Sequence, residues 1–263
     1  MGQGTERAEI TRKKVLYEIP GMDDVTVLRG VEYQAGLTMD LYYPANSISA
    51  TVPAVVFVIG YSDAGAEAML GCKFNEMESY ISWARLVAAS GVAAITYANR
   101  EPAADLHSLI QYVRENAASL GIDAKRIGLW SASGNVPLAL DALMTERLAC
   151  AALCYGYMLD LDGSTGVAEA SKQWGFVNPG TGKSVSDFPK DVPLFIMRAG
   201  QDQFPHLNET IDGFVGQALA RNMPITVANH PTAPHAFDLF DDSETSREVI
   251  RQILDFLRFH LRA

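Results

Sequence analysis

The sequence is poor in cysteine, and this shortage excludes two ways of holding a protein together. Its 263 residues include three cysteines, Cys72, Cys150 and Cys154. A small odd number supplies no disulfide framework. No histidine or further cysteine flanks Cys150 and Cys154 at the spacing of metal ligands, so no metal site is expected. We interpret all three as small buried hydrophobic residues of a reduced, cytoplasmic protein.

Basic residues and long apolar runs are also scarce. The chain has 21 Lys and Arg against 31 Asp and Glu, a net charge of −10, which opposes binding to nucleic acid or to an anionic membrane. The longest apolar stretch, residues 52–61, has about half the length of a membrane-spanning helix. Residues 1–14 are polar and lack the apolar core of a signal peptide, which again favours a cytoplasmic location.

The sequence does contain a regular alternation of short β-branched runs and longer amphipathic segments. A β-rich opening covers residues 13–43, and the continuous apolar run 54–59 is typical of a strand buried on both faces. Further strands are predicted at 92–97, 127–130, 150–155, 194–198 and 225–228, and helices at 76–90, 103–120, 136–145, 207–221 and 244–261. This order predicts a single α/β domain over 1–263, with a mainly parallel sheet of about eight strands and helices on both faces.

Because function gathers at the carboxyl ends of parallel strands, the residues that follow each strand are the candidates for chemistry. Ser133 lies between a predicted buried strand and a helix, where a nucleophile elbow places its serine. The residues two positions before and after such a serine must be small. Ser131 meets this requirement, whereas Asn135 stands where glycine is usual. Taken alone, the stretch is equally consistent with a serine that merely caps the helix.

A nucleophilic serine needs a base and an acid that orients the base. Asp202 follows the strand 194–198, and His235 lies in the loop after the last strand. Taken alone, Asp202 is equally consistent with an ordinary aspartate in a turn. His230 lies beside a proline and is interpreted as structural, and His206 is too close to Asp202 in sequence to bridge to the serine. Serine, aspartate and histidine, each just beyond a strand, follow the chain order of α/β-hydrolases.

The sequence resembles the α/β-hydrolase superfamily, most of all its dienelactone hydrolase and bacterial esterase/lipase branch. The matching stretches lie within residues 35–260 and are Met39–Pro44, Val55–Tyr61, Ala94–Arg100, Arg126–Asn135, Arg198–Asp202 and Pro234–Asp238. The resemblance implies Ser133 as nucleophile, His235 as general base and then acid, and Asp202 as its orienting partner. It further implies an oxyanion hole formed by the backbone N–H groups of Tyr61 and Gly134.

Three departures from the family pattern refine this expectation. Ile59-Gly60-Tyr61-Ser62 replaces the frequent His-Gly-Gly, and Asn135 replaces the glycine of the elbow. Dienelactone hydrolases use a cysteine nucleophile, and none of the three cysteines lies at an elbow. The sequence therefore predicts a serine carboxylesterase that cleaves a small ester through an acyl-enzyme, without a cofactor.

Candidate substrate contacts lie in two segments. Residues 156–192 form a long connection that is expected to act as a lid or binding loop, in which Trp174 and Phe176 either line an apolar acyl pocket with Tyr61 or anchor the loop. Residues 63–80 offer a second wall, or ordinary core packing. Arg100, after another strand, is a candidate for a substrate carboxylate or for a surface ion pair.

Alternative functions remain at this point. The glycine spacing of Gly60–Gly65 argues against a dinucleotide-binding oxidoreductase. A degenerate hydrolase that only binds a ligand, and a small peptidase with the same triad, both stay open. The expected partner is a small-molecule ester, and the sequence leaves a homo-oligomer open.

Overall fold

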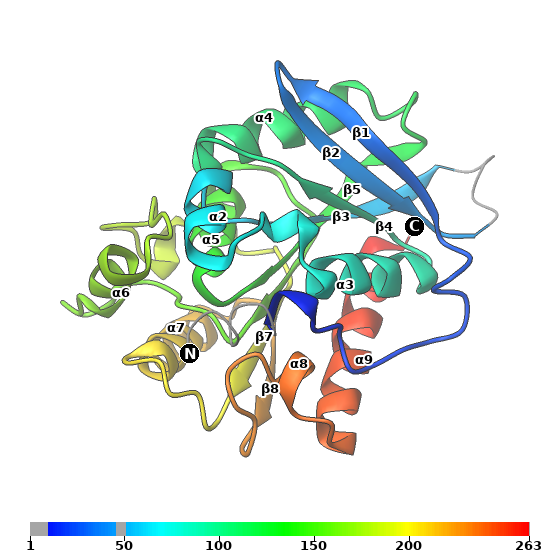
Figure 1. Cartoon of the computed structure of the whole chain (residues 1–263). Helices are drawn as coiled ribbons and strands as arrows, with labels where there is room; N and C mark the ends of the chain where they lie inside the picture. The colour runs from blue at the N-terminus through cyan, green and yellow to red at the C-terminus, as the bar shows by residue number, and fades with distance from the viewer. Residues whose placement is uncertain (1–9, 46–50, 263) are drawn as a thin grey trace.

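The apolar runs of the sequence form one eight-stranded sheet through the centre of the molecule (Figure 1). In the computed structural model, which describes residues 10–45 and 51–262, the strand order is β1-β2-β4-β3-β5-β6-β7-β8. The strands are β1 (Thr26–Gln34), β2 (Leu37–Tyr43), β3 (Val52–Phe57), β4 (Ala93–Tyr97), β5 (Ile122–Ala132), β6 (Ala151–Cys154), β7 (Leu194–Ala199) and β8 (Ile225–His230). The pairs β1–β2 and β2–β4 are antiparallel and all other pairs are parallel, so the predicted fold class is confirmed.

Helices cover both faces of this sheet (Figure 1). They are α2 (Asp63–Leu70), α3 (Glu78–Ala89), α4 (Pro102–Glu115), α5 (Val136–Thr145), α6 (Gly166–Trp174), α7 (Leu207–Ala220), α8 (Phe237–Phe240) and α9 (Glu244–Leu261). Helices α3 and α9 pack on one face, and α4, α5 and α7 pack on the other. Because the parallel strands all point the same way, their carboxyl ends bring distant loops to one edge of the sheet.

The segment 156–192 is more ordered than the sequence suggests. It contains α6 and a short 3-10 helix, Val185–Asp187, in addition to irregular chain. The first turn of α6 is capped from a distance: the carboxylate of Asp160 accepts the N–H groups of Val167 and Ala168 at 2.8 and 2.9 Å. A cap several residues upstream leaves no local sequence signal, which explains why this helix was not predicted.

The central strands are buried on both faces, as expected from their continuous apolar runs. Every residue of β4 and β6 is buried. Cys150 and Cys154 lie in this core, and burial raises the pKa of the Cys150 thiol to about 12. Cys72 is only partly buried, which departs from the expectation for it. Within the part of the chain that the structure describes, no helix combines the length and apolar character of a membrane span.

Candidate active site

Ser133 lies in a tight turn between β5 and α5. Its backbone has a φ of 58°, in the left-handed region that non-glycine residues rarely adopt. Neighbouring chain approaches this turn so closely that one glycine is required there and a second is tightly packed. A Cβ on Gly156, just beyond β6, would lie 2.7 Å from the carbonyl oxygen of Ser133, and one on Gly60, just beyond β3, would lie 3.0 Å from that of Gly134. The ends of three parallel strands therefore meet around the serine.

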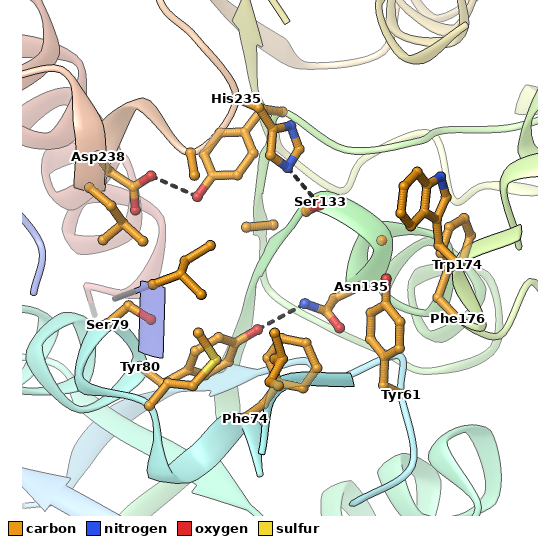
Figure 2. A pocket seen from close by; sticks show the side chains of 18 of the residues that line it. Tyr61, Phe74, Ser79, Tyr80, Ser133, Asn135, Trp174, Phe176, His235 and Asp238 are labelled. Carbon is orange, nitrogen blue, oxygen red and sulfur yellow. Dashed lines mark hydrogen bonds between the residues drawn. The ribbon is translucent and has the colours of Figure 1, made fainter. Parts of the chain in front are cut away.

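The structure brings the three predicted triad residues together. The Oγ atom of Ser133 lies 2.8 Å from Nε2 of His235, and Figure 2 shows the imidazole turned toward the serine. On its other side, Nδ1 of His235 donates to Oδ2 of Asp202 at 2.6 Å. The side chain of Asp202 is fully buried, and its Oδ1 accepts the N–H of Phe204 at 3.0 Å. With the proton held on Nδ1, the lone pair of Nε2 faces the serine hydroxyl.

Two aromatic rings fix the imidazole in place. Phe204 lies with its ring centroid 4.4 Å from that of His235, and Tyr155 packs edge-on at 5.0 Å. The hydroxyl of Tyr155 donates to Asp238 at 2.7 Å, and Trp83 Nε1 donates to the other carboxylate oxygen at 2.6 Å. Burial raises the pKa of Asp238. Tyr155 and Asp238 were not identified as candidates, although Tyr155 follows a strand and Asp238 closes the motif that contains His235.

The turn after β3 lies against the elbow. A Cβ on Gly134 would lie 2.5 Å from the hydroxyl oxygen of Tyr61 and 2.7 Å from Cδ1 of Phe176. The three residues therefore touch at a point next to the serine. The ring of Tyr61 stacks on Phe74 at 5.1 Å and meets Phe176 edge-on at 6.1 Å. The contact of Tyr61 with Gly134 is made by its phenol, whereas the backbone of this turn approaches the elbow at Gly60.

A cavity of about 270 Å³ opens beside Ser133. Its wall is rich in aromatic residues, and Figure 2 shows several of these rings around the serine and histidine. The aromatic lining residues are Tyr61, Phe74, Tyr80, Trp83, Trp130, Tyr155, Tyr157, Trp174, Phe176 and Phe204. Both Trp174 and Phe176 from the segment 156–192 are among them, as are Met69 and Met77 from the second expected wall.

The lining contains almost no charge. Asp238 is its one carboxylate, and no lysine or arginine belongs to the lining that the structure describes. Arg100 lies elsewhere, where its guanidinium donates to the carbonyl of Ala35 at 2.9 Å. The hypothesis that Arg100 pairs with a substrate carboxylate in this cavity therefore has no support.

The remaining histidine candidates lie outside the site. His230 is buried at the end of β8, where Nε2 contacts Ser246 at 3.1 Å and Asp241 at 3.2 Å. His206 precedes the first turn of α7 in a left-handed conformation. Among the described residues, no cluster of three or more His, Cys, Asp or Glu side chains has an arrangement that would hold a metal ion.

Comparison with known proteins gives a match in structure only. No protein-family model matches the chain, and no curated protein does. The solved structures it resembles include a bacterial heroin esterase (16% identity, TM-score 0.69, covering 99% of this chain and 91% of that one). They also include an ester-hydrolase from the Lake Arreo metagenome (17% identity, TM-score 0.73) and fungal esterases from Rhizomucor miehei (15% identity, TM-score 0.72). Each of these two matches covers 98% of this chain and 89% of the other.

Sequence identity this low shows the fold rather than the activity. The coverage is nearly complete in both directions, and the sheet has the eight, mainly parallel strands that the sequence predicts. The chain has the α/β-hydrolase fold. Its place in the dienelactone hydrolase branch stays a prediction.

Proposed function

We propose that this protein is a serine hydrolase that cleaves a small carboxylic ester. The observation that carries the proposal is the unbroken hydrogen-bonded series from Ser133 through His235 to Asp202, at an elbow whose serine has a φ of 58°. A serine that merely caps a helix needs neither a histidine at 2.8 Å nor a buried carboxylate behind it. The solved structures named above are themselves described as esterases, which agrees with this proposal.

The reaction follows from the positions of the atoms. Ser133 Oγ attacks the ester carbonyl while its proton passes to Nε2 of His235, and the carbonyl oxygen becomes an oxyanion. The bond to the alkoxy oxygen then breaks, and the leaving alcohol takes the proton from Nε2. Water repeats the sequence on the acyl-enzyme, which releases the carboxylic acid and restores the serine. Asp202 keeps the ring oriented and stabilises the imidazolium.

The oxyanion is stabilised, in this proposal, by the backbone N–H groups of Gly134 and Tyr61. Gly134 follows the nucleophile at the start of a helical turn, and Tyr61 directly follows Gly60, whose backbone packs against the elbow. Donors of this kind are worth roughly 2.7–4 kcal/mol of barrier each. They act best in a site that excludes water, which the aromatic lining favours.

The substrate class follows from the cavity. An aromatic wall without lysine or arginine favours a neutral ester with an apolar acyl or alcohol group. The segment 156–192 supplies Trp174 and Phe176 to this wall and acts, in our proposal, as the binding loop. A cavity of about 270 Å³ suits a substrate with a small ring or a short chain.

The decisive experiment replaces the nucleophile. We expect Ser133→Ala to abolish hydrolysis of p-nitrophenyl esters and to leave the circular dichroism spectrum and melting temperature unchanged. A fluorophosphonate probe should label the wild type and leave the variant unlabelled, because only an activated serine reacts. Unlabelled wild-type protein would instead support a degenerate hydrolase. Faster turnover of aminoacyl anilides than of esters would support the peptidase.

A further inference from the structure

The residue that departs from the elbow pattern, Asn135, has a bonding arrangement that a glycine cannot provide. It lies two positions after Ser133 and is buried, with 3% of its surface exposed. Its Oδ1 accepts the N–H of Gly60 at 2.7 Å, and its Nδ2 donates to the hydroxyl oxygen of Tyr80 at 2.8 Å. Figure 2 shows the carboxamide directed toward Tyr80 and away from the serine hydroxyl.

The orientation of this carboxamide is determined by its partners. If the amide were reversed, Nδ2 would meet the N–H of Gly60, and two donors would face each other. Tyr80 is a neutral phenol, because burial raises its pKa well above the usual value, and its oxygen is free to accept from Nδ2. The acceptor therefore points at the turn after β3 and nowhere else.

The two peptide units that flank Gly60 are thus each held at one point, and the second of them also carries the N–H of Tyr61. The N–H of Gly60 is bound by Asn135, and its carbonyl accepts the N–H of Val177 at 2.9 Å. Val177 belongs to the segment 156–192, just beyond Phe176. The next backbone N–H after Gly60 is that of Tyr61, the proposed oxyanion donor. Fixing the preceding residue limits how far this N–H can turn away from the oxyanion.

We infer that Asn135 is a positioning residue, which sets the oxyanion donor of Tyr61 by binding the N–H of the preceding glycine. This inference rests on the proposed function. With a glycine at 135, the buried N–H of Gly60 would lose its acceptor, and a buried unpaired donor costs enough to shift a turn. A donor fixed before the reaction stabilises the transition state without reorganisation, so its loss reduces kcat more than it changes KM.

The test uses two substitutions at one position. Asn135→Leu keeps the volume of the side chain without an acceptor, and Asn135→Gly restores the residue usual at this position and creates no clash. We expect both to lower kcat for p-nitrophenyl acetate by about 10- to 100-fold, less than deletion of a donor itself, and to change KM by less than about threefold. Affinity for a trifluoromethyl ketone, which forms an oxyanion on Ser133, should fall by the same factor as kcat/KM.

Two further variants separate positioning from a general packing effect. Tyr80→Phe leaves the bond to Gly60 in place and removes only the outer partner, so its kcat should lie between those of the wild type and Asn135→Leu. Asn99→Leu makes the same chemical change at another buried carboxamide, whose side chain has no hydrogen-bond partner among the described residues. Its kcat should stay within about twofold of the wild type.

The inference is overturned if folded Asn135→Leu and Asn135→Gly keep kcat within twofold of the wild type. It is also overturned if the kcat of both variants falls no further than that of Asn99→Leu. The same holds if the trifluoromethyl ketone binds both variants as tightly as it binds the wild type. These outcomes differ from failure of the proposed function, in which the wild type itself neither turns over esters nor reacts with a fluorophosphonate.

Discussion

At the scale of single residues, the serine is held in a conformation that costs energy. A φ of 58° at a non-glycine residue costs on the order of 1–3 kcal/mol. It persists because a buried strand and a buried helix fix the chain on either side: Ala132 ends β5, and Val136 begins α5. The strain lifts Oγ away from the backbone and toward Nε2 of His235. The geometry that destabilises the turn is therefore the geometry that exposes the nucleophile.

The contributions of the side-chain hydroxyl and the backbone N–H of Tyr61 can be measured separately. Tyr61→Phe removes the hydroxyl, which lies over Gly134, and leaves the backbone N–H in place. Because the backbone is the proposed oxyanion donor, we expect kcat to stay within about fivefold of the wild type, measured with p-nitrophenyl esters. A loss of about 100-fold or more would show that the phenol, rather than the amide, stabilises the oxyanion.

The sequence was informative about these residues to different degrees. Ser133, Asp202 and His235 were predictable because each follows a strand, and parallel strands deliver such residues to one edge. The contact of Asn135 with Gly60 was not predictable, because it joins residues 75 positions apart through side-chain geometry. Asp238 gave a weak signal at most, since its partners Trp83 and Tyr155 come from two other elements.

At the scale of elements, the end of β6 is packed against the start of α5 with no room for a side chain. A Cβ on Gly156 would lie 2.2 Å from Cγ2 of Val136 and 2.7 Å from the carbonyl oxygen of Ser133. Such contacts require strand and helix to separate. Because Ser133 lies between them, any separation moves the nucleophile relative to His235, so this packing couples stability to catalysis.

We therefore expect Gly156→Ala to lower the free energy of unfolding by about 1–3 kcal/mol or more and to reduce kcat at least tenfold. Urea unfolding and ester kinetics measure the two effects. The matched control is Gly213→Ala inside α7, where an added Cβ meets nothing within 4 Å, and it should stabilise the protein by about 0.5–1 kcal/mol. Unchanged kinetics in Gly156→Ala would mean that the turn tolerates displacement.

Helix α6 carries Trp174 to the mouth of the cavity. This side chain is 39% exposed, and its ring meets Phe204 edge-on at 5.4 Å, while Phe204 covers His235. The existence of this helix was obscured in the sequence by its remote cap at Asp160. The two aromatic residues of the segment, Trp174 and Phe176, could nevertheless be read from the sequence as candidates for the pocket wall.

If Trp174 contacts the bound substrate, its removal should matter for large substrates only. We expect Trp174→Ala to raise KM for a p-nitrophenyl benzoate by about tenfold, because it removes one aromatic wall. The kinetics with p-nitrophenyl acetate should change by less than about twofold. Equal effects on both esters would mean that the tryptophan anchors the segment, as the alternative interpretation of it holds.

At the scale of the whole molecule, Asp238 joins parts of the chain that are far apart in sequence. Its carboxylate binds Trp83 of α3 and Tyr155 at the end of β6, and its backbone carbonyl accepts the N–H of Leu16 at 2.9 Å. The residue lies in α8, next to the loop that carries His235. One buried aspartate thus connects the N-terminal segment, through its backbone, with the helix layer and the catalytic edge of the sheet, through its carboxylate.

The raised pKa of Asp238 predicts how its contribution to stability varies with pH. The carboxyl group is desolvated in the folded state, so it binds a proton up to a higher pH than in the unfolded chain, where its pKa is about 3.9. Between these two pKa values the folded state holds more protons than the unfolded state. The free energy of unfolding therefore falls as pH rises through this window. The contribution of Asp238 to stability is greatest at the low-pH end of the window.

Asp238→Asn removes this titration and leaves one acceptor oxygen for two donors, so the Tyr155 hydroxyl must turn to accept from the new NH₂ group. We expect the variant to be about 1–3 kcal/mol less stable than the wild type, with a deficit that is larger near pH 4 than near pH 7. Urea unfolding at both pH values measures it, and subtracting the wild type removes the effect of the other carboxylates. Asp212→Asn, at an exposed ion pair with Arg198, is the control and should cost less than about 1 kcal/mol. A deficit that grows toward pH 7 would show that the buried carboxylate stabilises the protein in its charged form.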